Sequence, residues 1–413
     1  MHIAIIGCGA SGLASIQRAI HHNVECTAFE MSDSIGGMWQ YREETDLGDL
    51  GNPMYYSLRT NLPVPLMEFG DFKFEPKSGS SFPHHTEVME YLDAFAERYD
   101  LYSRIKFHHK VIKIKRISEK WLINVKNLQT NEDEELEFDG VMICSGHFSK
   151  PLWPTIPGME SFPGMQIHSL CYRRNNIFKD KKVLVVGAGP SGMDIGVDIA
   201  EVAEKVIISY SRFSTKTKPA ENVEMKPRTC SIEADIIHFA DESCESVDAI
   251  IYCTGYKYYY PYLDPSCGIE VEDDLVIKPL FKHMFNIHHP SMCFIGLIRM
   301  ISSILFYLQA EVYMKCLTQQ VQLPSTEEML KSFEEECEMK AKRNLPKSYF
   351  FFLGRNLHQY FDDLAEVGQL KPTPPALLNI LRKVVSIVGE DFSKLRKYKF
   401  KIVDDVNFLC CEE

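Results

Sequence analysis

The sequence has little of what marks a nucleic-acid-binding or membrane protein. Among its 413 residues, 57 acidic side chains outnumber 45 basic ones, which gives a formal net charge of −12. Such a chain is repelled by phosphate backbones and anionic lipids, so neither nucleic acid nor membrane is expected as a partner. The one long apolar run, 291–310, contains Arg299, and a charge inside a bilayer is costly. A strand followed by a core helix is expected there.

The sequence also lacks the cysteine patterns of metal sites and disulfide frameworks. It has 13 cysteines, an odd number, with no C-x-x-C pair and no zinc-ligand spacing. There is no N-x-S/T acceptor site, and Met1 leads directly into a predicted strand. These features predict a reducing, cytoplasmic compartment, with secretion as the alternative if a leader has been removed. The pairs His84–His85 and His288–His289 lack nearby ligands, and no metal site is expected.

Two copies of one local pattern are present instead. The stretches "IAIIGCGASGLAS" (3–15) and "VVGAGPSGMD" (185–194) each read as a strand, a G-x-G-x-x-G turn and a helix. In such a turn, glycines permit a tight bend, close approach to a pyrophosphate and close helix–strand packing. The helix N-terminus then offers free N–H groups to the phosphates. The sequence therefore predicts an α/β protein with two dinucleotide-binding, Rossmann-like domains.

The ends of the second strands predict which nucleotide each unit binds. Glu30 lies 23 residues after Gly7, where an acid can receive the free ribose hydroxyls of FAD. At the same distance from Gly187 stands Tyr210, followed by Ser211 and Arg212. A carboxylate there would repel a 2′-phosphate, whereas a hydroxyl and a guanidinium would hold it. We therefore expect NADPH at the second turn and FAD at the first; the alternative is that Arg212 is an ordinary surface arginine.

The remaining chain is divided by its turn residues and periodicity. We expect a helix over 86–99, antiparallel strands over 110–127 and a buried strand over 138–146. The acidic stretch 131–139 is expected to be a solvated turn between strands. After a Tyr- and Pro-rich connector at 256–265, the chain is expected to be mainly helical, broken by a strand at 293–296. The predicted domains are a first FAD-binding part at 1–160, an NADPH-binding domain at 161–255, and a second FAD-binding part with C-terminal helices at 256–413.

With these motifs the chain resembles the flavin-containing monooxygenases. The segments "FEMSDSIGGMWQY", "YYSLRTNLPVPLMEFGDFKF", "FPHHTEVMEYLDAFAERYDL", "VMICSGHFSKPLWP" and "CTGY" recur in that order in the family. The family signature reads here as "FPGMQIHSLCY", 162–172, followed by Arg173, where Baeyer–Villiger relatives end in Trp-Pro. This favours the N- and S-oxygenating branch. The compact NADPH block is most similar to insect members, including pyrrolizidine-alkaloid N-oxygenases.

The resemblance implies a fold and a set of cofactor contacts. The fold is a glutathione-reductase-like architecture, in which the FAD domain is interrupted by a smaller NADPH domain. Expected FAD contacts are Gly7, Cys8, Gly9, Ala10, Ser11, Gly12, Glu30, Gly37, Met38, Trp39, Thr60, Asn61, Val111 and Gln309. Expected NADPH contacts are Gly187, Gly189, Pro190, Ser191, Gly192, Met193, Asp194, Ser211 and Arg212.

The resemblance also implies an activity: NADPH- and O2-dependent oxygenation of a tertiary amine or a sulfide through a C4a-hydroperoxyflavin. Asn61 is the predicted catalytic side chain, because an uncharged amide can donate and accept at once; the alternative is that it only stabilises its own turn. His168 is expected either to help fix the domain interface or to be structural. The rival functions are a Baeyer–Villiger oxygenase, an NADPH oxidase and a flavin-binding sensor. A homodimer is the expected assembly.

Overall fold

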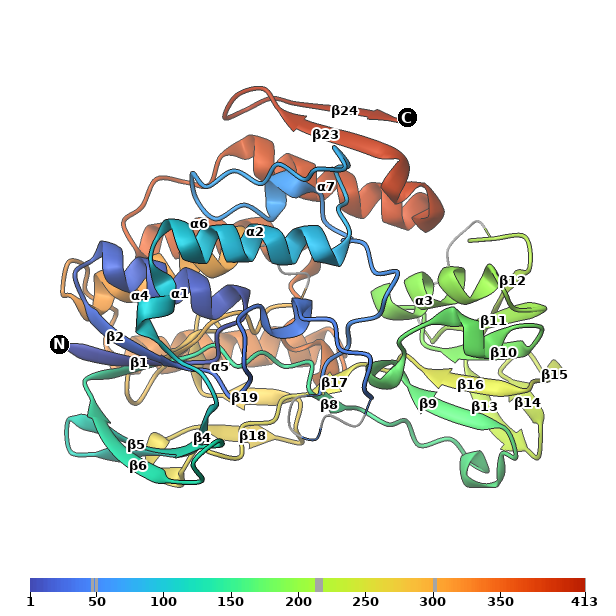
Figure 1. The fold of residues 1–413 in the computed structure, drawn as a ribbon, viewed down its shortest axis with the longest axis horizontal. Coiled ribbons are helices and arrows are strands. Elements are labelled where there is room, and N and C mark those ends of the chain that lie inside the picture. Colours follow the sequence, from blue (N-terminus) through green and yellow to red (C-terminus); the bar gives the residue numbers. More distant parts are fainter. Residues whose placement is uncertain (46–47, 49–50, 212–217, 300–302, 413) are drawn as a thin grey trace.

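The computed structural model describes residues 1–45, 48, 51–211, 218–299 and 303–412. Its described strands form two large sheets, and Figure 1 shows them in two lobes. The first lobe contains both ends of the chain. The second, drawn in green to yellow, contains the middle of the sequence around α3 (Pro190–Ala200).

The sheet of the first lobe has the strand order β20-β21-β22-β7-β1-β2-β3. Their bounds are β1 (His2–Ile6), β2 (Glu25–Phe29), β3 (Ile105–Lys106), β7 (Gly140–Ile143), β20 (Leu280–Phe281), β21 (Phe285–Asn286) and β22 (Met292–Phe294). The run from β22 to β3 is parallel, whereas β20, β21 and β22 pair antiparallel. The central strands are apolar without alternation because both faces of the sheet are covered. Helix α1 (Ala10–His21) packs against α4 (Ser303–Leu317).

The sheet of the second lobe repeats this plan on a smaller scale. Its order is β12-β11-β10-β16-β9, and every pair in it is parallel. The strands are β9 (Met165–His168), β10 (Lys182–Val186), β11 (Lys205–Ser209), β12 (Val223–Lys226) and β16 (Ala249–Tyr252). An antiparallel sheet of β13 (Thr229–Glu233), β14 (Ile236–Phe239) and β15 (Cys244–Ser246) lies beside it. All of these strands lie within residues 161–255, the predicted NADPH-binding domain. The domain boundaries themselves stay a prediction.

The chain enters and leaves the second lobe at one place. The entering strand β8 (Lys150–Pro151) pairs antiparallel with the leaving strand β17 (Tyr256–Lys257). The second lobe is thus one continuous insertion in the sequence of the first lobe. In the first sheet β1, which precedes the first glycine turn, lies between β2 and β7. In the second sheet β10, which precedes the second glycine turn, lies between β11 and β16. That arrangement puts each turn at a topological switch point, where nucleotides bind in such sheets.

Several expected elements are present and two expectations were wrong. The helix predicted at 86–99 is α2 (His85–Arg98), and the strand and helix predicted within 291–310 are β22 and α4. The predicted antiparallel strands are β4 (His109–Ile117) and β5 (Lys120–Asn127). However, the acidic stretch predicted as a turn forms the mostly exposed strand β6 (Asp133–Phe138), paired with β5.

The region after residue 256 is also less helical than expected. It contains α4, α5 (Thr326–Lys342), α6 (Leu357–Val367) and α7 (Pro375–Glu390). Short strands precede them, among which β18 (Glu270–Glu272) pairs with β19 (Val276–Lys278), and the chain closes with a hairpin of β23 (Tyr398–Ile402) and β24 (Phe408–Glu412). That hairpin lies over α7 at the top of Figure 1. Within the described residues, none of the helices combines the length and apolarity needed to span a membrane.

Candidate functional site

The first glycine turn joins β1 to α1. Gly7 has φ +94°, a conformation that favours glycine, and a Cβ on Gly12 would lie 2.0 Å from the carbonyl oxygen of Gly7. The helix N-cap is Gly9, with no side-chain cap. The first N–H groups of α1 are therefore left for a ligand, as in a dinucleotide cradle. Cys8, Ala10 and Ser11 complete this turn as predicted from the sequence.

Glu30 is held at the end of β2 beside that turn. Its Oε2 accepts from the backbone N–H of Cys8 at 2.8 Å, and its Oε1 accepts from the N–H and hydroxyl of Ser32 at 2.9 and 2.8 Å. The residue is only 8% exposed. These three donors fix the carboxylate, and a carboxylate offers about four acceptor positions, so one remains for a ribose hydroxyl. The prediction of a ribose-binding acid here fits this geometry.

The loop with the two adjacent glycines covers the first turn. Gly36 donates its N–H to the carbonyl of Cys8 at 3.0 Å, and a Cβ on Gly37 would lie 3.0 Å from the Cα of Gly9. Met38 and Trp39 follow in a short 3-10 turn and are half-buried. Gly37 is therefore required by the approach of two backbones, and Gly36 by its φ of +102°, and the loop lies beside any pyrophosphate in the turn.

The Thr60–Asn61 segment divides into a buried and an exposed half. Thr60 is 2% exposed; its N–H donates to the carbonyl of Pro83 at 3.0 Å and its hydroxyl to the carbonyl of Leu62 at 2.9 Å. Asn61 is exposed, and among the described residues no protein group hydrogen-bonds its side-chain amide. The amide of Asn61 is thus presented by a fixed backbone and is free for a ligand.

Two expected FAD contacts lie deeper in the protein. Val111 is a buried residue of β4, near the strand end at Glu30, whose carbonyl accepts from the N–H of His109 at 2.8 Å. Gln309 is fully buried on α4: its Oε1 accepts from the N–H of Gly296 at 3.0 Å, and its Nε2 donates to the hydroxyl of Tyr360 at 2.8 Å. This arrangement favours a supporting role for Gln309 at the Gly296 turn over a direct contact with flavin.

The second glycine turn joins β10 to α3 with the same backbone plan. Gly187 has φ +111°, and a Cβ on Gly192 would lie 1.7 Å from the carbonyl oxygen of Gly187. Gly189 is the N-cap, and Gly189, Pro190 and Ser191 are exposed. The start of α3 therefore offers N–H groups to solvent or to a phosphate. Met193, in contrast, is buried in the core of the second lobe.

The strand end beside the second turn carries no acid. Ser209 closes β11 with its hydroxyl bonded to the carbonyl of Pro227 at 3.1 Å, and Tyr210 and the exposed Ser211 follow. Nothing in these described residues would repel a 2′-phosphate. Arg212, the predicted phosphate partner, lies outside the described residues, so its role stays a prediction.

The family signature forms contacts within and between the lobes. Tyr172 is buried and its hydroxyl donates to Asp198 of α3. The Arg173 guanidinium donates to the carbonyls of Glu44 and Met54 in the first lobe, at 3.0 and 3.2 Å. His168 is buried, accepts from the N–H of Leu170 at 3.1 Å and packs on the rings of Trp153 and Tyr256, near the entering and leaving strands.

Asp194 is the predicted NADPH contact whose surroundings differ most from expectation. Its carboxylate accepts from the hydroxyl of Tyr55 and, at 2.5 Å, from the guanidinium of Arg396. Both partners come from the first lobe, 139 residues before and 202 residues after Asp194. Sequence reasoning missed Arg396, because a basic residue in the run "KLRKYKFK" carries no sign of a distant carboxylate. Among the described residues, no His, Cys, Asp and Glu side chains gather as a metal site.

Known proteins match this chain along most of its length. A family model described as flavin-binding monooxygenase-like matches residues 1–217 and 219–404. The flavin-containing monooxygenase FMO GS-OX4 of Arabidopsis thaliana is 33% identical, over 89% of this chain and 84% of its own. Senecionine N-oxygenase of Tyria jacobaeae is 30% identical, over 98% and 91%. The solved structure of S-allyl-L-cysteine S-oxygenase from Allium sativum superposes with a TM-score of 0.89 at 29% identity, covering 96% and 94%.

Proposed function

The chain belongs to the flavin-binding monooxygenase-like family, and on this basis we propose that it transfers one oxygen atom of O2 to the nitrogen of a tertiary amine. A thioether sulfur is the second acceptor that we propose. Family membership confirms the predicted resemblance, the predicted fold with two dinucleotide-binding domains, and the dependence on FAD and NADPH. The assignments of single residues remain proposals.

Each cofactor has a set of residues that fits it. The turn of Gly7, Gly9 and Gly12 with Glu30 would hold the pyrophosphate and ribose of FAD, because the N–H groups and the carboxylate are already in place. The start of α3 would hold the pyrophosphate of NADPH. When bound, the flavin takes a hydride from NADPH and activates O2. The protein binds, orients and excludes water around that chemistry.

The observation that carries the proposed function is the free amide of Asn61 on a fixed backbone. With the cofactors bound, its Nδ2–H groups would be able to donate to an oxygen atom while Oδ1 accepts a hydrogen bond from NADPH. The amide brings no charge that would hasten loss of activated oxygen as hydrogen peroxide. Thr60 contributes by position, since its N–H and hydroxyl are both satisfied inside the protein.

The two acceptors are supported by different relatives. The insect senecionine N-oxygenase aligns with nearly the whole chain, which supports a tertiary amine of the pyrrolizidine-alkaloid type. The Allium enzyme, whose substrate is a cysteine thioether, shares the whole architecture. Both acceptors are soft, uncharged nucleophiles when unprotonated, so one oxygenating centre serves either, and the walls of the substrate site decide between them.

The test is product formation under labelled oxygen. Purified protein loaded with FAD is mixed with NADPH and 18O2, and separately with senecionine, S-allyl-L-cysteine and cyclohexanone. We expect an N-oxide carrying one 18O atom, in a fixed ratio to the NADPH consumed. Hydrogen peroxide in that ratio without any product would make the protein an oxidase. An ester from cyclohexanone without N-oxide would make it a Baeyer–Villiger oxygenase.

Asn61→Ser and Asn61→Asp test the catalytic assignment. We expect product formation to fall by about 10²–10³-fold, as for the loss of one donor to a developing charge, while FAD stays bound. The matched control is Asn379→Ser on α7, whose amide accepts from Arg382 at 3.1 Å on the helix surface. Normal product yield from both Asn61 variants would refute the assignment.

Assembly and compartment are also proposals. We propose a homodimer, which sedimentation equilibrium tests directly. We propose a cytoplasmic location, supported by an odd number of cysteines, 13, with no C-x-x-C pair among them. Imaging of a tagged full-length chain in its own cells would overturn the second proposal if the signal were secreted.

A further inference from the structure

One guanidinium joins the segment that carries Asn61 to the helix that follows the second glycine turn. We propose that Arg396 is a positioning residue, which holds the Thr60–Asn61 segment of the first lobe against α3 of the second lobe and so sets the flavin relative to the hydride donor. The inference rests on the proposed function, because that function puts NADPH at the start of α3 and Asn61 beside the flavin.

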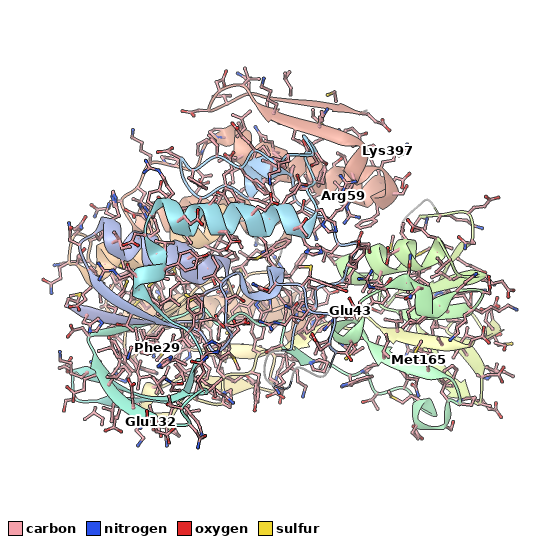
Figure 2. All side chains as sticks on the ribbon, in the orientation of Figure 1. Phe29, Glu43, Arg59, Glu132, Met165 and Lys397 are labelled. Carbon is pink, nitrogen blue, oxygen red and sulfur yellow. The ribbon has the colours of Figure 1, made fainter. Side chains whose placement is uncertain are left out.

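The contacts of Arg396 reach both lobes at once. Its Nε donates to the carbonyl of Thr60 at 3.2 Å, and its Nη2 donates to the carbonyl of Arg59 at 2.7 Å. Its Nη1 donates to Oδ1 of Asp194 at 2.5 Å. The residue lies in the 3-10 turn Phe392–Lys397, after α7. Figure 2 labels Arg59, a partner of Arg396, and Lys397, the next residue in the chain. Both lie on the side of the first lobe that faces the second.

The bond to Thr60 acts on Asn61 through the peptide group. The carbonyl of Thr60 and the N–H of Asn61 belong to one planar unit, so an anchored carbonyl oxygen fixes the direction in which Asn61 leaves the backbone. Three donors in one rigid plane are needed to bond Arg59, Thr60 and Asp194 together. Arginine provides that fork, whereas lysine provides a single ammonium group.

Both oxygens of the Asp194 carboxylate accept hydrogen bonds in this junction. Oδ2 accepts from the hydroxyl of Tyr55, which belongs to the same first-lobe segment as Arg59 and Thr60, and Oδ1 accepts from Arg396. Burial by itself would lower the pKa of Arg396, but the Asp194 carboxylate raises it, so the guanidinium keeps its charge inside the junction. We therefore assign Asp194 to lobe positioning, and the NADPH contact predicted from the sequence stays a prediction.

The junction is distinguishable from an ordinary surface ion pair by a matched control. Arg174 also crosses between the lobes, bonding both oxygens of Glu43 at 3.0 and 3.2 Å and lying over the ring of Tyr56, but it is half exposed. Among the described residues it makes no hydrogen bond to Thr60 or to α3. A second control is Lys394, an exposed neighbour in the same 3-10 turn as Arg396. Loss of either control side chain should change neither cofactor binding nor coupling.

The experiment compares Arg396→Lys, Arg396→Ala and Asp194→Asn with Arg174→Ala and Lys394→Ala. For each FAD-loaded variant we would measure the rate of flavin reduction by NADPH without oxygen, the dissociation constant of NADP⁺, and the ratio of product to NADPH consumed. For both Arg396 variants we expect flavin reduction to slow by about tenfold, the effect of losing one hydrogen bond to a charged group, and coupling to fall in the same direction. FAD content should be unchanged.

Hydrogen exchange gives a readout that needs no turnover. In Arg396→Ala, amides in a peptide covering 55–62 should exchange faster than in the unchanged protein, whereas a peptide covering 109–127 should not change. If Arg396→Ala fails to retain FAD, Arg396→Lys and Asp194→Asn decide, because both keep the size of the side chain.

The outcomes separate this inference from the proposed function. Unchanged flavin reduction and unchanged exchange at 55–62 in the Arg396 variants would overturn the positioning role. If the unchanged protein made neither N-oxide nor sulfoxide, the proposed function would fail, but flavin reduction by NADPH would still test the junction. Equal losses in Arg174→Ala and Arg396→Ala would also overturn it, because the effect would then belong to any contact between the lobes.

Discussion

The two glycine turns share their backbone and differ in what surrounds them. Gly7 and Gly187 both have positive φ, and the N-caps Gly9 and Gly189 have φ values of −71° and −75°. Beside the first turn, however, an anchored carboxylate closes the strand, and the adjacent loop brings Gly37 within 3.5 Å of a Cβ on Gly9. A Cβ on Gly189 would meet nothing within 4 Å.

This difference separates two parts of nucleotide recognition. On the proposed function, the shared backbone would recognise what FAD and NADPH have in common, the pyrophosphate, through N–H groups at a helix start. The strand ends would recognise the ribose, and there Glu30 carries a charge that its counterpart Tyr210 lacks. The covered first turn suits a cofactor that remains bound, and the open second turn suits one that exchanges in every cycle.

The largest effect should come from breaking each turn separately. Gly12→Ala and Gly192→Ala would each put a methyl group within 2.0 Å of a backbone oxygen, which cannot move aside as a flexible side chain can. We expect a cost of about 1–3 kcal/mol or more in folding free energy, as for overpacking, and loss of the ligand at that turn. Gly12→Ala should yield protein without flavin. Gly192→Ala should keep its flavin and lose reduction by NADPH.

Absorbance of bound flavin and anaerobic reduction by NADPH check this pair. The control is Gly389→Ala on α7, where an added Cβ meets nothing within 4 Å and both readouts should stay normal. If Gly192→Ala lost FAD while Gly12→Ala kept it, the assignment of the two cofactors to the two turns would be reversed.

A smaller effect should follow from making the strand ends alike. Ser211→Asp puts a carboxylate one residue beyond the position that corresponds to Glu30, and a like-charge contact with a 2′-phosphate costs on the order of 1 kcal/mol or more. We expect the preference for NADPH over NADH, measured as a ratio of kcat/KM values, to fall by about tenfold. Ser211→Asn, which has the same size without the charge, should change the ratio little. An unchanged ratio in Ser211→Asp would place the 2′-phosphate away from this strand end.

The parts predicted well from the sequence are those with strong local patterns. Fully apolar strands such as β1 and glycine turns before helices depend on neighbours in the sequence, so the two nucleotide-binding units were identified correctly. Strand β6 was missed because only Phe138 is buried in it, so the stretch has no apolar alternation. Strands of two or three residues, such as β18 and β20, are too short to show any period.

The candidate site was predictable to the same extent. Residues within a turn or at a fixed distance from it, such as Glu30, follow from local geometry. The junction of Tyr55, Asp194 and Arg396 depends on tertiary packing that brings together three distant segments, and the sequence around each residue gives no sign of the other two. Gln309 lies on a helix that the sequence predicted correctly. Its hydrogen-bond partners, Gly296 and Tyr360, were not predictable, because tertiary packing brings Tyr360 to it.

The smallest effect should come from loosening the acid of the first unit without removing it. Ser32→Ala deletes one of three protein donors to Glu30, the hydroxyl at 2.8 Å, and leaves the N–H groups of Cys8 and Ser32 in place. Since one such bond contributes about 1 kcal/mol, we expect the dissociation constant of FAD to rise by about fivefold, measured by flavin fluorescence. Ser34→Ala, whose hydroxyl donates to the exposed Asp33 at 3.0 Å, is the control. A complete loss of FAD in Ser32→Ala would contradict this expectation. It would mean that the Ser32 hydroxyl alone orients the Glu30 carboxylate, and that the N–H groups of Cys8 and Ser32 contribute too little to hold it.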